Sequence, residues 1–337
     1  MPWQIGKWQF EDDRGEKMFS KSREIDRRTF VQLAGAACLV GAVTPMLAQS
    51  PPVSAKAENP MGLVVWIEEG QSIDAAIREV RDLGFPVCQV GFKHLTPDVV
   101  KPLQSALSKY GITATAFSEH GPGQRIFDFY QGPPTIGIFP VATRDARVHN
   151  LKLAADIASQ LGIPAIHTHI GFTPEDPNDP LYPQTVAALR EIAVHCKQKG
   201  IIFLCELGQE TPITLVRLIE DVGTGNVFVN LDFANLICYG KGNPVDAMDV
   251  LGERVRGTHA KDAVFPTDPW NLGKTVPFGE GKVDFPTVFA QLRKVNYSGP
   301  ILIEHGAQSE KAREEILRRK AFLGKLMGTL SSSQGAV

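Results

Sequence analysis

The sequence predicts an α/β protein: a single (β/α)8 barrel domain, or TIM barrel, that follows an N-terminal export signal. Three observations carry this prediction. From Met61 onward, short apolar runs alternate with longer helix-like segments eight times. Several of the expected helices end on a glycine before the next run, which is a common helix stop signal. Eight such units in about 250 residues match the size of this barrel.

The expected strands are short and apolar, as parallel strands covered on both faces should be. They lie at Leu63–Ile67, Val87–Phe92, Thr113–Phe117, Ala165–Ile170, Ile201–Glu206, Val227–Asp232, Val255–Ala260 and Ile301–Glu304. The expected helices lie at Ser72–Leu83, Pro97–Tyr110, Arg144–Leu161, Tyr182–Lys199, Pro212–Val222, Pro244–Leu251, Phe285–Val295 and Ser309–Met327. The alternative is an open doubly wound sheet, which usually has a glycine-rich turn after its first strand. The residues Ile67-Glu68-Glu69-Gly70 do not form such a turn.

The N-terminal region differs from the rest of the chain. We expect residues 1–57 to form an extension with an export signal and residues 58–337 to form the barrel. The pair Arg27-Arg28 precedes residues 30–48, which carry no charge. This pattern is typical of a twin-arginine signal. A membrane anchor is the alternative, but glycines and a proline make this stretch a weak spanning helix. The twin-arginine translocase is therefore an expected partner, the expected location is periplasmic or secreted, and no stable membrane anchor is expected.

Charged side chains stand at the ends of the last four expected strands. The fifth and sixth strands end on Glu206 and Asp232, the seventh carries His259, and the eighth ends on Glu304. Active sites of this barrel lie at the C-terminal ends of the strands. Carboxylates that share a site repel one another unless a cation is present. A divalent metal would remove the conflict, although each residue taken alone could equally be a helix cap or a surface charge.

Several segments in the second half of the chain resemble a known family. They are "CELGQET", "NLDFANLICYGKGNPVDA", "THAKDA", "VPFGEGKVDFP" and "GPILIEH". Over roughly residues 61–327 the sequence is similar to the sugar phosphate isomerase/epimerase family, which is related to xylose isomerase. The resemblance implies that Glu206, Asp232, His259 and Glu304 hold one divalent metal. Manganese is favoured, with magnesium, cobalt and zinc as alternatives. The family resemblance also implies that Glu206 and Glu304 act as acid and base.

The function implied by this resemblance is isomerisation or epimerisation of a sugar or keto-sugar by proton transfer through an enediolate. One alternative is a lyase or dehydratase that acts on a keto-cyclitol or 3-keto-glycoside. Another is a secreted sugar-binding protein without catalysis. A trinuclear zinc nuclease is not expected, because Asn235 stands where the related DNA-repair endonucleases have histidine. The net charge of −2 likewise gives no general attraction for nucleic acid.

Other polar residues are candidates for contacts with a sugar substrate. His167 and His169 alternate on the fourth strand, so both face one side. His169 is nearer the strand end and could bind a substrate hydroxyl, or it could be a satisfied core histidine. His120 follows the third strand and could line the site. Asn235 and Lys261 are also expected to face substrate.

Two further acidic residues are candidates for supporting the metal ligands. Glu210 lies four residues beyond Glu206, where it could contact that ligand or act as a cap. Asp262 could orient His259, since metal-bound histidines are commonly held by a carboxylate, or it could stay on the loop.

Overall fold

The structure is a computed structural model that describes residues 59–305 and 310–332. The expected export signal and the expected boundary between residues 57 and 58 lie outside these residues, so both stay predictions. Within the described ranges, every helix is too short or too polar to cross a lipid bilayer.

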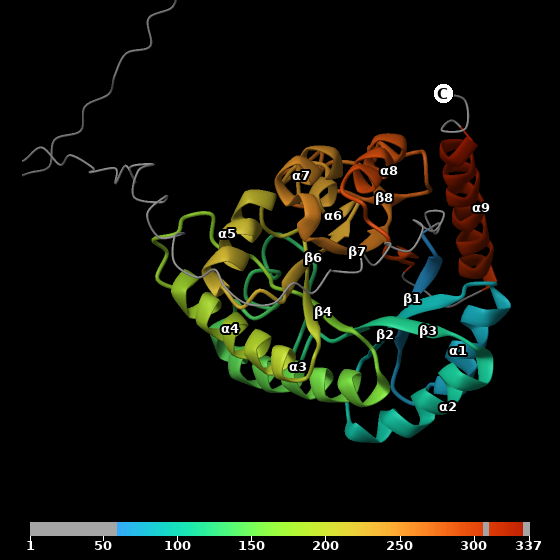
Figure 1. The fold of residues 1–337 in the computed structure, drawn as a ribbon. Helices are drawn as coiled ribbons and strands as arrows, with labels where there is room; N and C mark the ends of the chain where they lie inside the picture. The colour runs from blue at the N-terminus through green and yellow to red at the C-terminus, as the bar shows by residue number, and fades with distance from the viewer. Residues whose placement is uncertain (1–58, 306–309, 333–337) are drawn as a thin grey trace, which may run out of the picture. The chain divides into compact units, whose positions relative to one another are not determined.

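Eight parallel strands close into a barrel in the order β1, β10, β7, β6, β5, β4, β3, β2 (Figure 1). The strands are β1 Met61–Ile67, β2 Val87–Phe92, β3 Thr113–Ser118, β4 Ala165–His169, β5 Ile202–Glu206, β6 Val227–Asp232, β7 Val255–Ala260 and β10 Ile301–Ile303. The expected fold is therefore confirmed. The eighth barrel strand is one residue shorter than expected, so Glu304 lies just past its end and donates its backbone N–H to Ala260 O at 3.3 Å.

Helices follow the strands and cover the outside of the barrel (Figure 1). The main ones are α1 Ile73–Asp82, α2 Val100–Tyr110, α3 Val141–Leu161, α4 Tyr182–Gln198, α5 Pro212–Val222, α7 Pro244–Leu251, α8 Phe285–Lys294 and α9 Glu310–Ser332. Helix α3 begins three residues before the expected start. Pro140 takes extended backbone (φ −63°, ψ 117°) as the N-cap, and the first helical turn follows directly.

Several short elements were not expected from the sequence. They are the helix α6 Asn235–Cys238, the antiparallel pair of β8 Asp262–Ala263 with β9 Thr275–Val276, and the 3-10 turn η2 Gly252–Arg254. The first three residues of the helix expected at Pro97–Tyr110 form a 3-10 turn, η1 Pro97–Val99. Helix α6 and the β8–β9 pair follow β6 and β7, so they stand at the end of the barrel where the charged strand ends are found.

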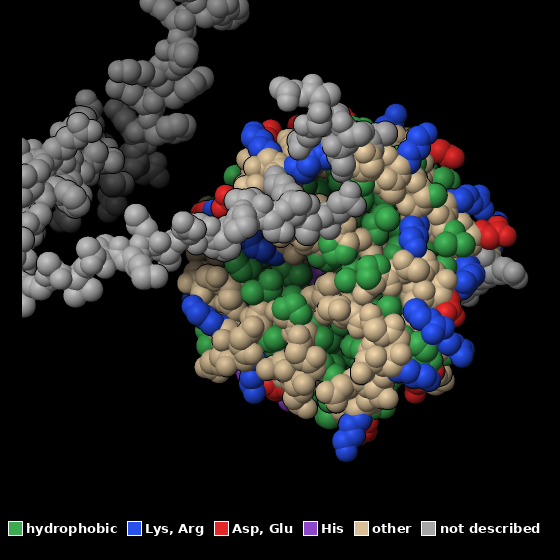
Figure 2. Space-filling view, turned by 45° about the vertical axis from the view of Figure 1, so that its right-hand side comes forward, with side chains coloured by type: hydrophobic (Ala, Val, Ile, Leu, Met, Phe, Trp, Pro, Cys, Tyr) green, Lys and Arg blue, Asp and Glu red, His purple; other side chains and the backbone are tan. Residues whose placement is uncertain are grey.

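The inside of the barrel changes from apolar to polar along the strands. A small interior cluster contains Ala116, Ala165, Leu204, Ile202 and Phe228. Alternate residues of a strand share a face, so the next inward residue after Leu204 is Glu206. In the same way Asp232 lies on the face of Phe228. On the side of the molecule shown in Figure 2, hydrophobic side chains surround a hollow, while most charged side chains lie toward the outline.

Candidate functional site

Three carboxylates and one imidazole converge at the C-terminal ends of four neighbouring strands. Glu206 and Asp232 are the last residues of β5 and β6. His259 is the penultimate residue of β7, and Glu304 follows β10. Asp232 and His259 are register partners across β6 and β7. One ligand atom from each of the four side chains lies within 4.8 Å of the others. The structure thus brings together the four residues that the sequence singled out.

The ring nitrogen Nδ1 of His259 is at the centre of this cluster. It lies 3.3 Å from Glu206 Oε1 and 3.3 Å from Glu304 Oε2. Asp232 Oδ2 is 3.9 Å away. Burial alone would lower the pKa of His259, but Glu206 and Glu304 raise it to about 10. The negative charges of the three carboxylates are therefore concentrated around His259 Nδ1.

Lys261 supplies a positive charge beside the same carboxylates. Its Nζ lies 2.9 Å from Glu304 Oε2 and 3.2 Å from Asp232 Oδ2. Burial raises the pKa of Asp232 to about 7 even though Lys261 opposes that change. For Glu304, burial also favours a higher pKa, but Lys261 and His259 hold it below its usual range. Among the described residues, Lys261 and His259 are the polar neighbours of both Asp232 Oδ2 and Glu304 Oε2.

Asn235, the first residue of α6, contacts two members of the cluster and Lys261. Its side-chain Nδ2 donates to Glu206 Oε1 at 2.9 Å, and its Oδ1 accepts from Lys261 Nζ at 3.0 Å. Its backbone N–H donates to Asp232 Oδ1 at 2.8 Å. Both polar ends of the Asn235 side chain therefore have protein partners. The prediction that Asn235 and Lys261 bind substrate stays a prediction.

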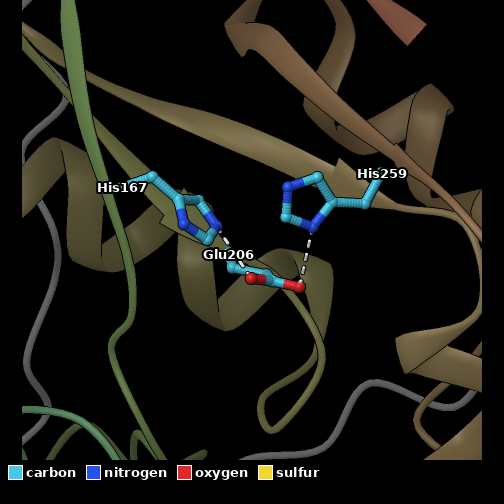
Figure 3. Close-up of side chains that lie close together, drawn as sticks. All are labelled: His167, Glu206 and His259. Carbon is cyan, nitrogen blue, oxygen red and sulfur yellow. Dashed lines mark hydrogen bonds and ion pairs between the residues drawn. The ribbon is translucent and has the colours of Figure 1, made fainter. Parts of the chain in front are cut away.

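His167 holds the other oxygen of Glu206, a role that the sequence analysis missed. Figure 3 shows Glu206 between the rings of His167 and His259. The Nδ1 atom of His167 is 3.1 Å from Gln89 Nε2, which can only donate. The proton of the neutral ring therefore lies on Nε2, which is 2.7 Å from Glu206 Oε2. The available signal was the period-two spacing of His167 and His169, which places both on the inner face.

Glu206 is buried among these nitrogen donors. His169 Nε2 lies 3.3 Å from Glu206 Oε2, beside the shorter contact from His167. Burial would raise the pKa of Glu206, but His169, His259 and His167 hold it well below its usual range. A strand with an apolar interior can therefore end on a carboxylate here, because both carboxylate oxygens have polar partners.

An aromatic wall flanks the cluster. It consists of Trp66, His120, His169 and Phe127. The His120 ring stacks on Trp66 (4.8 Å between centroids) and on His169 (5.4 Å), and Phe127 meets His169 edge-on at 5.4 Å. These side chains line a pocket of about 220 Å³ together with Glu206, His259 and Glu304. Burial lowers the pKa of His120 well below its usual value, so the wall is uncharged there.

Asp262 does not orient His259. Residues 259 and 261 point into the barrel, so the intervening and following residues, 260 and 262, point away. Asp262 Oδ2 instead accepts hydrogen bonds from the backbone of Gly279 (2.9 Å) and Gly281 (3.0 Å), and Oδ1 accepts from Val283 at 3.1 Å. A Cβ atom at Gly281 would lie 2.0 Å from Asp262 Oδ1, which explains the glycine. Asp262 thus organises the "GEGK" loop.

Glu210 makes no hydrogen bond to Glu206 in the described part of the chain. Its carboxylate is buried, and neither oxygen accepts a hydrogen bond within the described part of the chain. Glu210 lies between the end of β5 at Glu206 and the start of α5 at Pro212. Burial raises the pKa of Glu210 to about 8. The polar contacts to Glu206 come from His167 and Asn235, and the supporting role expected of Glu210 stays a prediction.

The fold and the cluster together define a class, namely TIM-barrel proteins with an acidic and imidazole site at the C-terminal rim. The chain belongs to the xylose isomerase-like TIM barrel family, whose profile matches residues 77–323. This confirms the family that the sequence resemblance indicated.

Curated relatives in this family carry sugar epimerase names. A putative L-ribulose-5-phosphate 3-epimerase of Escherichia coli is 43% identical over 89 residues, which are 26% of this chain and 29% of that protein. A protein of the same name from Haemophilus influenzae is 27% identical over 214 residues, which are 56% of this chain and 70% of that protein. The chain spans about a third of the length of the first curated relatives that it matches.

A solved structure matches over most of the barrel. The xylose isomerase domain protein from Planctomyces limnophilus is 28% identical to this chain, with a TM-score of 0.75. The match covers 81% of this chain and 99% of that one.

Proposed function

We propose that this protein is a divalent metal-dependent isomerase or epimerase of a sugar or keto-sugar. The observation that carries the proposal is the position of the two glutamates. Glu206 and Glu304 come from β5 and β10, with β6 and β7 between them in the barrel. Both carboxylates lie 3.3 Å from His259 Nδ1. They therefore flank the cluster from two sides, as two-sided proton transfer requires. The epimerase names of the family relatives support the same reaction class.

The donor set fits a divalent metal. Glu206, Asp232 and Glu304 offer carboxylate oxygens, and His259 offers Nδ1, all within 4.8 Å. Three buried carboxylates share this place with one ammonium, Lys261, so a divalent cation would balance the remaining negative charge. Oxygen-rich sites with one imidazole suit manganese, with magnesium, cobalt and zinc as alternatives.

In the proposed reaction the protein side chains have separate roles. The metal supplies Lewis-acid polarisation of the substrate carbonyl when it is bound. One of Glu206 and Glu304 removes the proton from the carbon next to that carbonyl, which gives an enediolate. For an epimerisation, the other glutamate returns a proton to the opposite face. His167 and Asn235 hold Glu206 in one orientation while this happens.

The aromatic wall and its neighbours would bind the sugar. His169 Nδ1 is buried and has no hydrogen-bond partner among the described residues, so it is free to meet a substrate hydroxyl. His120 lines the same pocket with an uncharged ring. Lys261 lies at the carboxylates and can contact a substrate oxygen there.

Metal binding is tested by measuring the metal content of the purified protein. The purified chain should carry close to one divalent ion. Glu206→Gln and Asp232→Asn should lower that occupancy, whereas Glu280→Gln, an exposed control, should not. Full occupancy in a variant that lacks two of the four ligands would contradict the assignment.

The reaction is tested by solvent exchange. Metal-loaded protein in deuterated water should introduce deuterium next to the carbonyl of a ketose or keto-sugar. Glu304→Gln keeps an oxygen and nearly the same volume, so it should still bind sugar while turnover falls by at least ~100-fold. Exchange followed by loss of water or of a glycosidic group would indicate the lyase alternative. The absence of exchange with every ketose tested would leave the binding-protein alternative.

We also propose export through the twin-arginine translocase, which delivers the protein to the periplasm or outside the cell. The pair Arg27-Arg28 before an uncharged stretch supports this proposal. Replacing both arginines by lysine should retain the protein in the cytoplasm, and unchanged delivery would mean another route.

A further inference from the structure

Two aromatic side chains that are far apart in the sequence, on different loops, stack on each other. Tyr130 lies on the loop after β3, and Trp270 lies on the loop after β7. Their ring centroids are 5.7 Å apart and their planes differ by 13°. Both remain well exposed, at 57% and 63%. Large aromatic surfaces that stay open to solvent commonly mark binding sites.

The strand order shows where this pair lies. Going round the closed barrel from β3 to β7 takes four steps in either direction, so the two strands are opposite each other. Both loops leave the C-terminal ends of their strands. The loop after β3 reaches the far side of the barrel end, because Phe129 meets Tyr239 edge-on just after α6, and Tyr130 stacks on Trp270. The stacked pair Tyr130–Trp270, called the bridge here, therefore joins two loops at the end of the barrel that carries the candidate site.

The bridge continues the aromatic wall of the pocket. Phe127 lines that pocket beside His169, and it lies only three residues before Tyr130. Phe127 is also 48% exposed. Exposed aromatic faces thus lead from the pocket out to the bridge at the rim.

The bridge is held in place before any ligand arrives. Asp128 Oδ1 accepts from the backbone N–H of Tyr130 at 2.8 Å, and Asp268 Oδ1 accepts from that of Trp270 at 2.8 Å. Such turns fix the local backbone. Arg147 further anchors the first loop through hydrogen bonds to the carbonyls of Gln124 and Thr135. A preordered aromatic surface loses little entropy when it binds.

We propose that Tyr130 and Trp270 form a stacking subsite for a second ring of the substrate, so that the preferred substrate is a glycoside or disaccharide rather than a free monosaccharide. This inference rests on the proposed function. The reacting unit occupies the pocket below, and the attached ring packs its C–H face on the bridge. A second copy of this chain is the other possible occupant. Stable interfaces bury about 800 Å² per partner, whereas two aromatic side chains supply roughly 150–250 Å² each.

The test compares short and extended substrates. Deuterium exchange is measured with ketohexoses and with matched disaccharides in which the ketohexose carries a second sugar ring. In Trp270→Ala and Tyr130→Ala, kcat/KM for the disaccharide should fall about tenfold, the usual scale for an aromatic contact. The value for the ketohexose should stay within about twofold. Trp270→Phe keeps a ring and should recover most of the loss. Phe265→Ala, an exposed aromatic on the same loop, should change neither value.

Each result of these measurements either supports or contradicts the stacking subsite. Equal losses on both substrates, or no loss on either, would overturn it while the proposed reaction stands. If the wild type exchanges no substrate, the proposed reaction fails, and calorimetric binding decides the subsite: tighter disaccharide binding that Trp270→Ala abolishes supports it, and equal binding refutes it. A wild-type dimer that Trp270→Ala dissociates would assign the pair to self-association and overturn the subsite.

Discussion

Replacing Glu210 by glutamine should stabilise the protein in a pH-dependent way. The side chain is buried, its two oxygens accept no hydrogen bond within the described residues, and burial raises its pKa to about 8 from the ordinary 4.5. The folded state therefore binds this proton more tightly than the unfolded state. Stability from this group is fully present below pH 4.5 and is lost as the pH rises toward 8.

The size of the effect follows from the two pKa values. Each pH unit above 4.5 costs about 1.36 kcal/mol until the folded pKa is reached. At pH 7 this is about 3 kcal/mol as an upper limit. Glutamine has nearly the same shape and does not ionise, so Glu210→Gln should recover this free energy. For a domain of this size the expected gain is roughly 6 to 12 °C in Tm at pH 7.

The assay is thermal unfolding of both proteins from pH 4 to pH 8 at a fixed metal concentration. The difference in Tm should be near zero at pH 4 and should grow steadily with pH. Glu280→Gln, which changes an exposed glutamate, should leave that difference flat. A variant that is destabilised at every pH would refute the reasoning, because Glu210 would then have an unrecognised partner that stabilises its charged form.

Three other predictions follow from single side chains. His167→Gln removes the 2.7 Å contact to Glu206 and should weaken metal affinity roughly 10- to 100-fold in a calorimetric titration; unchanged affinity would contradict the role assigned to His167. Asp262→Asn weakens the acceptor for three backbone N–H groups of the "GEGK" loop, so the free energy of unfolding should fall by about 2 kcal/mol while metal content stays the same. Arg147→Met removes hydrogen bonds to the loop after β3, so KM should rise more than kcat falls; a loss in kcat alone would argue against positioning.

The sequence predicted the strand ends well because one rule governs them. A short apolar strand that closes on a carboxylate places that carboxylate on the inner face at the rim, as with Glu206 and Asp232. The rule needs no tertiary information beyond the barrel itself. His167 was missed because a neutral histidine inside an apolar strand gives no charge signal. Its partners Gln89 and Ser118 belong to other strands, and only the closed barrel brings them together.

Contacts between loops could not be predicted from the sequence, for a related reason. Stacking of Tyr130 on Trp270 joins residues far apart in the chain, and no local pattern marks either one. The candidate role of Asp262 in orienting His259 failed for a simpler reason. Strand alternation past His259 already directs residue 262 outward, and a count along β7 would have shown it.

The ammonium of Lys261 gives the site a built-in counter-ion, and this sets its formal charge. Glu206, Asp232 and Glu304 together with Lys261 leave two negative charges when His259 is neutral. In the proposed function one divalent cation would cancel these charges, so the loaded site would be electroneutral. A neutral sugar can then enter without leaving an uncompensated charge in a buried place, whereas a charged group beside the cluster would need a partner of its own. In the proposed reaction the proton moves from the substrate carbon to one of the two glutamates. The negative charge gained by the enediolate therefore equals the charge lost by that carboxylate, and the site as a whole would stay neutral.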